Sequence, residues 1–153
     1  MVPVARDATV AYNGITCDNN VPCNSIPHGS EPTVLSFKGN RDYERILLGF
    51  DLPATTPKKC VLHIPKPAEG DSYNLAVVST DSNWDEATVT GANKDIAGKR
   101  IATVKSPAAT VDVSEACQAA TGNRLSLFVD TEEGMVKFHS HDSGSADVFM
   151  LEC

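Results

Sequence analysis

Short runs of alternating apolar and polar residues follow one another along the chain, separated by proline, glycine, asparagine and aspartate. The run DATVAY alternates and then meets Asn13-Gly14, a pair typical of a tight hairpin turn. Alternation with a period of two places successive side chains on opposite faces of a strand. The pattern predicts about ten short strands. The candidate runs are residues 7–12, 33–38, 44–52, 59–65, 73–80, 87–92, 99–105, 109–113, 124–130, 135–141 and 147–153.

Two of these runs indicate by their apolar positions which face of each strand is buried. The predicted core-facing residues are Ile46, Leu48 and Phe50 in ERILLGFDL, and Leu35 and Phe37 in TVLSFK. The opposite faces then carry Arg45, Leu47 and Asp51 in the first run, and Val34, Ser36 and Lys38 in the second. We therefore expect Arg45 and Lys38 to point toward solvent.

The run GMVKFHSHDS (residues 134–143) has basic or titratable side chains at every second position. Lys137, His139 and His141 alternate with the apolar Val136 and Phe138. If this run lies beside the two runs described above, its basic side chains and theirs would form one basic patch. Such a patch would be notable, because the chain as a whole is acidic.

Helical periodicity is limited to SEACQAATG, which predicts one short helix near 114–121. Ser114 is a suitable N-cap, and Gly122 is a suitable stop. Many short strands with one short helix favour an all-β protein, a jelly-roll β-sandwich of two antiparallel sheets. The length of 153 residues fits a single domain, residues 1–153, with no internal repeat or linker.

The chain has 13 basic and 20 acidic residues, a net charge of −7 at pH 7. This balance argues against a nucleic-acid partner, because phosphate binding needs clustered lysine and arginine. No apolar run is long enough to cross a bilayer, and the first residues show no apolar core of a signal peptide. We expect a domain with no membrane partner that is monomeric when isolated.

Five cysteines indicate a secreted, extracellular protein. Cys17 and Cys23 bracket the turn-rich CDNNVPC and are expected to form a small disulfide-closed loop. Cys60 begins one predicted strand and Cys153 ends the last, so a disulfide between them would join neighbouring strands. Cys117 would then be buried on the short helix as a small apolar group. The sequence does not fix the pairing among these last three.

The order of several motifs resembles a known family. DATV is followed by VLSFKG, RDYERILLGFDLP, CVLHIP and NLAVVSTDSNWDEATVTG, which contains Trp84, Glu86 and Val89. VDVSEACQA, NRLSLFVD and VKFHSHDSG complete the series. The chain resembles, over nearly its whole length, the secreted DNRLRE-type domains grouped with family 96 of the carbohydrate-binding modules.

The resemblance implies a jelly-roll sandwich without a catalytic centre, often attached to polysaccharide-degrading enzymes or cell-surface proteins. Characterised members bind acidic polysaccharide of the alginate type through basic residues near VLSFKG, which by position implies Lys38, Arg41 and Arg45 here. Two features depart from the family pattern. A histidine, His141, follows the serine of the late strand, and the cysteines look like a eukaryotic elaboration.

Aromatic side chains offer few stacking surfaces for a sugar, because they make up 6% of the chain. Tyr43 lies between Arg41 and Arg45 and is, with Tyr12, the best candidate. Trp84 is expected to pack under a loop whose turn Glu86 ties together. Recognition of charge therefore fits this chain better than an apolar platform for crystalline cellulose or chitin.

Metal binding is left open by the sequence. His139 and His141 share a face, are good zinc or copper ligands and are followed by Asp142. The sequence does not identify a third and a fourth ligand. His28 and His63 are candidates, but the sequence does not show where they lie in the fold. No cofactor is expected, although a structural calcium ion stays open. Oxygen ligands for calcium are available at Asp7, Asp18, Asn19, Asn20, Asp51 and Asp147.

Catalysis is not expected, because no G-x-S-x-G motif is present and the carboxylates of Asp85 and Glu86 would point to opposite faces of a strand. The sequence predicts a non-catalytic module that binds a cell-wall polysaccharide, an acidic one such as alginate or pectin, through a basic sheet face. The predicted binding residues are Lys38, Arg41, Tyr43, Arg45, Lys137, His139 and His141. Binding should be salt-sensitive and stronger when the histidines are protonated. The alternative is a structural or adhesion domain without glycan specificity.

Overall fold

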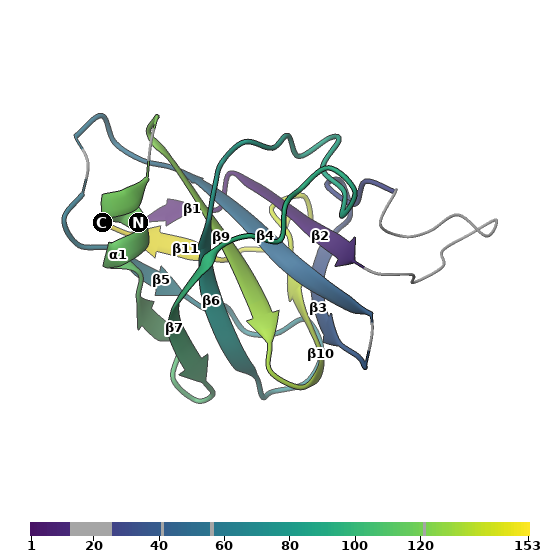
Figure 1. The fold of residues 1–153 in the computed structure, drawn as a ribbon. Coiled ribbons are helices and arrows are strands. Elements are labelled where there is room, and N and C mark those ends of the chain that lie inside the picture. The colour runs from purple at the N-terminus through teal and green to yellow at the C-terminus, as the bar shows by residue number, and fades with distance from the viewer. Residues whose placement is uncertain (13–25, 41, 56, 121) are drawn as a thin grey trace.

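The computed structural model describes residues 1–12, 26–40, 42–55, 57–120 and 122–153. Within these residues the protein is an all-β sandwich of two antiparallel sheets with one short helix, as predicted (Figure 1). The strand order of the smaller sheet is β1 (Val2–Pro3), β11 (Met150–Glu152), β5 (Val61–His63) and β8 (Thr110–Asp112). The chain ends lie side by side, because β1 pairs with β11 (Figure 1).

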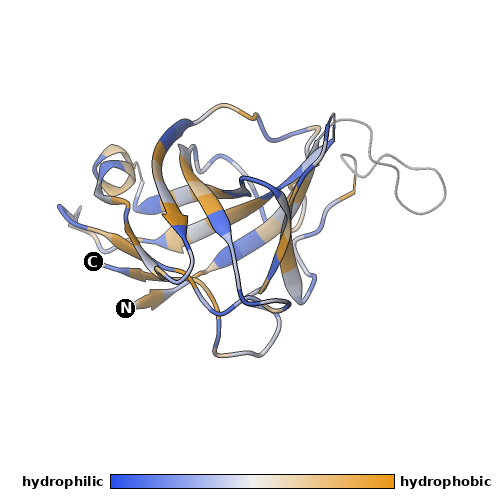
Figure 2. Ribbon diagram, turned by 90° about the horizontal axis from the view of Figure 1, so that it is seen from below, coloured by the Kyte–Doolittle hydropathy of each residue, from blue (hydrophilic) through white to orange (hydrophobic). Residues whose placement is uncertain are grey.

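The larger sheet contains most of the strands. Its order is β10 (Gly134–His139), β3 (Thr33–Lys38), β4 (Tyr43–Asp51), β9 (Arg124–Thr131), β6 (Asn74–Thr80) and β7 (Lys99–Lys105). A further strand, β2 (Arg6–Tyr12), pairs with β4. Hydrophobic and hydrophilic residues alternate along the strands, as Figure 2 shows, in keeping with strands that separate two chemical environments.

The main core lies between the two sheets. Ile46, Leu48 and Phe50 of β4 are fully buried there, as the alternation predicts, and they meet Leu62 of β5 and Leu151 of β11 in one cluster. Burial of a side chain of this size contributes about 1.5–3 kcal/mol to the free energy of unfolding. The sandwich therefore rests on the apolar phase of a few central strands.

A second apolar cluster covers the opposite, outer face of the larger sheet. Leu47 of β4 and Phe128 of β9 are fully buried in it, beneath Trp84 and Val89 of the segment 81–98 that connects β6 to β7. The Trp84 ring lies directly on the sheet, because a Cβ atom at Gly49 would come within 3.0 Å of its Cζ2 atom. The expectation that Trp84 packs under a loop is confirmed, whereas the outer face is not open to water at this point.

The predicted strand over residues 87–92 is absent from this part of the described structure. The side-chain carboxylate of Asp85 accepts a hydrogen bond from the Ala87 amide. The backbone carbonyl of Asp85 accepts one from the Val89 amide. Local bonds of this kind compete with the pairing that a strand needs. The alternation in ATVTGA instead places Val89 in the second cluster.

The predicted phase of β3 is inverted. Val34 and Ser36 are buried, whereas Leu35 and Phe37 are half-buried. Lys38 shares the phase of the buried residues and is exposed because it is the last residue of the strand. The hydroxyl of Ser36 explains its burial, since it donates to the Glu44 carbonyl and accepts from the Thr131 amide.

The helix α1 (Ser114–Ala119) confirms the predicted helix, with Val113 rather than Ser114 at the N-cap position. The Ser114 hydroxyl instead accepts a hydrogen bond from the Cys60 amide. Among the described residues, no helix combines the length and the apolar character needed to cross a membrane.

The disulfide predicted between Cys60 and Cys153 is wrong. Cys60 is bonded to Cys117 of α1, and Cys153 carries a free, exposed thiol whose sulfur lies 3.5 Å from that of Cys60. Both candidate partners reach Cys60, but α1 packs over this end of the sandwich and brings Cys117 into bonding position. Burial raises the pKa of the Cys153 thiol. The predicted pair Cys17 and Cys23 lies outside the described residues.

We expect the double substitution Cys60→Ala, Cys117→Ala to lower the free energy of unfolding by roughly 4 kcal/mol, because the disulfide closes a long loop in the unfolded chain. Urea denaturation would measure the loss. The control is Cys153→Ala, which should stay within about 1 kcal/mol of the parent protein. Peptide mapping of alkylated, unreduced protein that found Cys60 joined to Cys153 would contradict the assignment.

Candidate functional site

The three runs that carry the predicted basic residues are neighbours in the larger sheet. Strand β10 pairs with β3 along its whole length, and β3 pairs with the start of β4 at Phe37 and Lys38. The sequence-based expectation that these runs lie side by side is confirmed. Their basic side chains, however, point into three different environments.

Arg45 is buried rather than turned toward solvent, with 8% of its surface exposed. Its guanidinium donates two hydrogen bonds of 2.9 Å to the two carboxylate oxygens of Asp130 on β9 and a third to the carbonyl of Ile96. It also lies 3.6 Å from the centre of the Phe128 ring. The prediction that Arg45 faces solvent is wrong, because the segment 81–98 covers this part of the sheet. Asp130 neutralises the charge of Arg45.

Lys137 and His139 lie on β10, away from Arg45. The ammonium of Lys137 is 3.7 Å from a carboxylate oxygen of Glu69, and its side chain lines a small cleft that also contains His28, Glu31 and Glu44. His139 is half-buried opposite Thr33 of β3. The acidic neighbours of Lys137 leave this cleft without an excess of positive charge.

A shallow cleft on the outer face of the larger sheet contains three of the predicted binding residues, Lys38, Tyr43 and Arg45. It encloses about 300 Å³ and crosses β3, β4, β9, β6 and β7. The described residues that line it are Ser36, Phe37, Lys38, Gly39, Tyr43, Glu44, Arg45, Ala76, Val78, Arg100, Asp130, Thr131 and Glu132. We call it the sheet cleft. The predicted binding residue Arg41 lies outside the described residues.

The described lining of the sheet cleft holds three cations and three carboxylates, and two ion pairs, Arg45–Asp130 and Arg100–Glu132, account for four of these six charges. Lys38 is exposed and, among the described residues, has no carboxylate within ion-pair distance. Arg100 is 56% exposed and uses one nitrogen to bind Glu132, which leaves other guanidinium donors available. Both oxygens of Asp130 are taken by Arg45. Burial also raises the pKa of the Glu44 carboxyl.

Tyr43 supplies an aromatic ring at the sheet cleft. One face of the ring stacks on Tyr12, with 5.2 Å between the ring centroids and an interplanar angle of 20°. Tyr12, the other tyrosine proposed from the sequence, is buried and donates a hydrogen bond from its hydroxyl to the Lys94 carbonyl. It does not line the sheet cleft and instead holds the Tyr43 ring from behind.

A larger cleft of about 370 Å³ lies between α1 and the segments at residues 79–82 and 97–98. The described residues that line it include no aromatic ring, and Arg124 is their single cation. Asp81 also lines this cleft, and its carboxylate pairs with Lys94. The sheet cleft has the richer set of binding groups.

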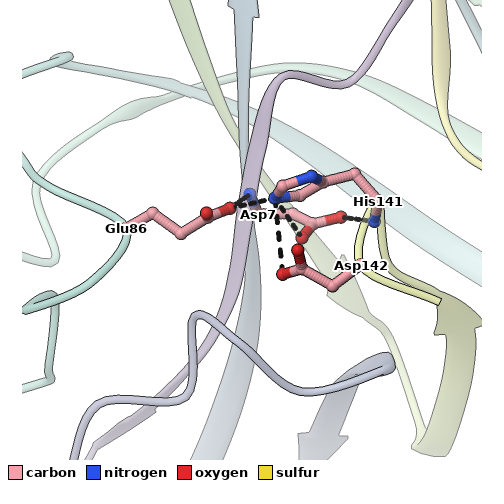
Figure 3. Close-up of side chains that lie close together, drawn as sticks. All are labelled: Asp7, Glu86, His141 and Asp142. Atoms are coloured by element: carbon pink, nitrogen blue, oxygen red, sulfur yellow. Dashed lines mark hydrogen bonds and ion pairs between the residues drawn. The ribbon is translucent and has the colours of Figure 1, made fainter.

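His141 lies in a cluster of carboxylates away from the sheet cleft (Figure 3). Its partners are Asp7 of β2, Glu86 of the segment 81–98 and its neighbour Asp142, and we call these four residues the histidine–carboxylate cluster. The Asp7 amide donates to Glu86 Oε2 at 2.8 Å, and the His141 amide donates to Asp7 Oδ2 at 2.9 Å. His141 Nε2 and Glu86 Oε2 share a further hydrogen bond.

Burial and charge act in opposite directions within this cluster. Burial raises the pKa of the Asp7 carboxyl more than the hydrogen bond from the His141 amide lowers it. Burial lowers the pKa of His141, but the hydrogen bond to Glu86 and the charges of Asp7, Glu86 and Asp142 outweigh it, so the net pKa is raised.

Gly29 lies against the backbone of Glu86. A Cβ atom at this glycine would fall on the Glu86 carbonyl, so the chain around residue 29 approaches the segment 81–98 as only glycine permits. The contact of Glu86 with Asp7 and His141 was not predictable from the sequence, because these residues are distant in sequence and meet only in the tertiary fold.

Arg100 is a cation of the sheet cleft that was not predicted from the sequence. It stands in the run KRIATVK, whose exposed and half-buried positions follow no clear alternation. Strand pairing places Arg100 beside Val78 of β6, on the face that also carries Phe128. No signal in the run itself distinguishes Arg100 from Lys99.

Residues 7–152 match the family model described as carbohydrate-binding module family 96. The chain belongs to this family.

The chain is also 33% identical over 156 residues to an uncharacterized secreted protein of Arthroderma benhamiae. That similarity covers 94% of this chain and 80% of the relative. The family resemblance inferred from the ordered motifs is confirmed for family 96.

We expect Arg45→Met to lower the free energy of unfolding by about 3 kcal/mol, because it leaves Asp130 partly buried without its cation. For a chain of this size the melting temperature should fall by roughly 6–12 °C, which calorimetry would measure. Lys38→Met is the control and should melt within about 2 °C of the parent protein. Equal melting temperatures for Arg45→Met and the parent would show that the pair adds no stability.

Proposed function

We propose that this protein is a non-catalytic module that binds an acidic cell-wall polysaccharide, of the alginate or pectin type, in the sheet cleft. The observation that carries the proposal is an exposed Lys38 without a carboxylate partner among the described residues, on a cleft that also presents Arg100. Arg100 binds Glu132 through one nitrogen and keeps other guanidinium donors for a ligand. Membership of a carbohydrate-binding module family supports a polysaccharide as the ligand.

Each lining group has a role that matches its chemistry. Arg100 offers a planar guanidinium that can hold a uronate carboxylate through two parallel hydrogen bonds, and Lys38 offers a mobile ammonium. Tyr43 offers a ring edge and a hydroxyl for sugar contacts. Arg45 lies at the base, where its pair with Asp130 keeps the cleft in shape instead of serving as a free cation.

The shape of the cleft suits a polymer rather than a small molecule. It runs over five strands and is shallow, so a chain of sugars can lie across it and continue on either side. Its cations Lys38 and Arg100 are exposed to solvent, and charge attraction at such a surface weakens as salt rises. We infer modest affinity that depends on ionic strength.

The location, oligomeric state and activity of the protein are inferred as well. We infer a secreted, extracellular protein, supported by the disulfide between Cys60 and Cys117 and by a relative described as secreted. We also infer that the isolated domain is a monomer and that binding is its activity, which its membership of a carbohydrate-binding module family supports.

We expect Lys38→Ala and Arg100→Ala each to weaken binding to alginate or polygalacturonate about 10-fold, the loss of one charge-assisted contact. Affinity electrophoresis at low and high salt would measure the change, with a neutral β-glucan for comparison. Lys99→Ala is a matched control, because it removes the same charge from the same strand while its side chain pairs with Glu115 outside the cleft.

Binding that is equally strong in high salt and in both cleft variants would contradict the proposal. Loss of binding in Lys99→Ala as well would indicate a general charge effect in place of a site. Failure on all acidic and neutral glycans, with retention on intact cells, would favour the structural or adhesion domain instead.

A further inference from the structure

The histidine–carboxylate cluster brings together ligand atoms from three distant parts of the chain. Asp7 comes from β2, Glu86 from the segment 81–98, and His141 and Asp142 from the turn after β10 (Figure 3). One ligand atom from each of the four residues lies within 4.8 Å of all the others. Three carboxylates beside one imidazole carry an excess of negative charge that internal pairing does not remove.

Asp7 has an oxygen without a partner at the centre of this group. Its side chain is fully buried, and among the described residues no donor bonds to Oδ1, while Oδ2 accepts from the His141 amide. Oδ1 faces His141 Nε2 at 3.8 Å. A buried carboxylate oxygen without a hydrogen bond is costly, so a cation bound there would stabilise the fold.

The spacing of the ligand atoms fits a small divalent ion. Zinc bonds of about 2.0–2.2 Å in a tetrahedral arrangement place ligand atoms roughly 3.3–3.6 Å apart. His141 Nε2 lies 3.5 Å from Asp142 Oδ2 and 3.8 Å from Asp7 Oδ1. Glu86 is closer to His141, but it is carried by a connecting segment and is 24% exposed, so its carboxylate has room to move outward.

We propose that Asp7, Glu86, His141 and Asp142 form a binding site for a divalent transition-metal ion, with Zn²⁺ as the best match. The donor set of one imidazole nitrogen and three carboxylate oxygens suits zinc, whereas calcium prefers six to eight oxygen ligands. The inference does not depend on the glycan proposal, since the cluster and the sheet cleft share no residue.

A metal ion at this place would act as a structural staple. It would join β2 to the segment 81–98 and to the turn after β10, in addition to the apolar contacts of β2 with Trp84 and Val89 and the hydrogen bonds within the cluster. Because the segment 81–98 also covers Arg45, the ion would hold the outer face of the larger sheet in its folded arrangement.

The experiment uses the purified chain, stripped of metal with a chelator and then titrated with ZnCl₂. We expect one Zn²⁺ per chain by calorimetry, and a melting temperature that rises by roughly 5–10 °C at a zinc concentration 100 times the Kd. Co²⁺ in place of zinc should give the visible absorption bands of a low-coordinate site, and CaCl₂ should leave the melting temperature unchanged.

Variants assign the site to these residues. His141→Gln should abolish the zinc-induced rise, and Asp142→Asn, at a more exposed position, should weaken zinc binding about 10–100-fold with the fold intact. The controls are His139→Gln and His63→Gln, which remove histidines outside the cluster and should leave the Kd unchanged. His63 tests a lone histidine–carboxylate pair, since it contacts Glu152.

Three results would overturn the proposal. The first is that the parent chain shows no saturable zinc binding. The second is that His141→Gln and Asp142→Asn bind zinc as tightly as the parent chain. The third is that calcium stabilises the chain and zinc does not. In the first case the cluster would be an ion pair between His141 and its acidic neighbours only.

Discussion

The packing of the segment 81–98 onto the outer face of the larger sheet is the contact on which the other features of this protein depend. Trp84 and Val89 bury the outer side chains of β2, β4 and β9. A sheet face that would otherwise be exposed to solvent thus becomes a second core. The same segment supplies the Ile96 carbonyl that holds Arg45 and the Glu86 carboxylate that meets His141. Where the segment ends, the sheet is left uncovered, and the sheet cleft lies there.

The two-sheet architecture and the main core were predictable from the sequence, because alternation reports directly on which side chains a sheet buries, whereas the order of the strands was not. Ile46, Leu48 and Phe50 are in the expected phase, and the runs containing Lys38, Arg45 and Lys137 are neighbours as expected. The resemblance of the ordered motifs to family 96 was also correct.

The features that were missed depend on contacts between distant residues. The alternation in ERILLGFDL predicts that Arg45 and Leu47 face solvent. The segment 81–98, which lies far from them in sequence, covers both residues. The phase of β3 was inverted because Ser36, a polar residue, is buried through two backbone hydrogen bonds that no local pattern shows. Arg100 and the histidine–carboxylate cluster are recognisable only once the strands are paired.

The pairing of β1 with β11 has a mechanical consequence. The two ends of the described chain leave from the same side of the sandwich, next to each other. A pulling force applied to both ends would therefore load the short β1–β11 ladder first and open its bonds one after another, like a zipper. The outer face of the larger sheet would be shielded from that tension, so a ligand held there could stay attached while the termini yield.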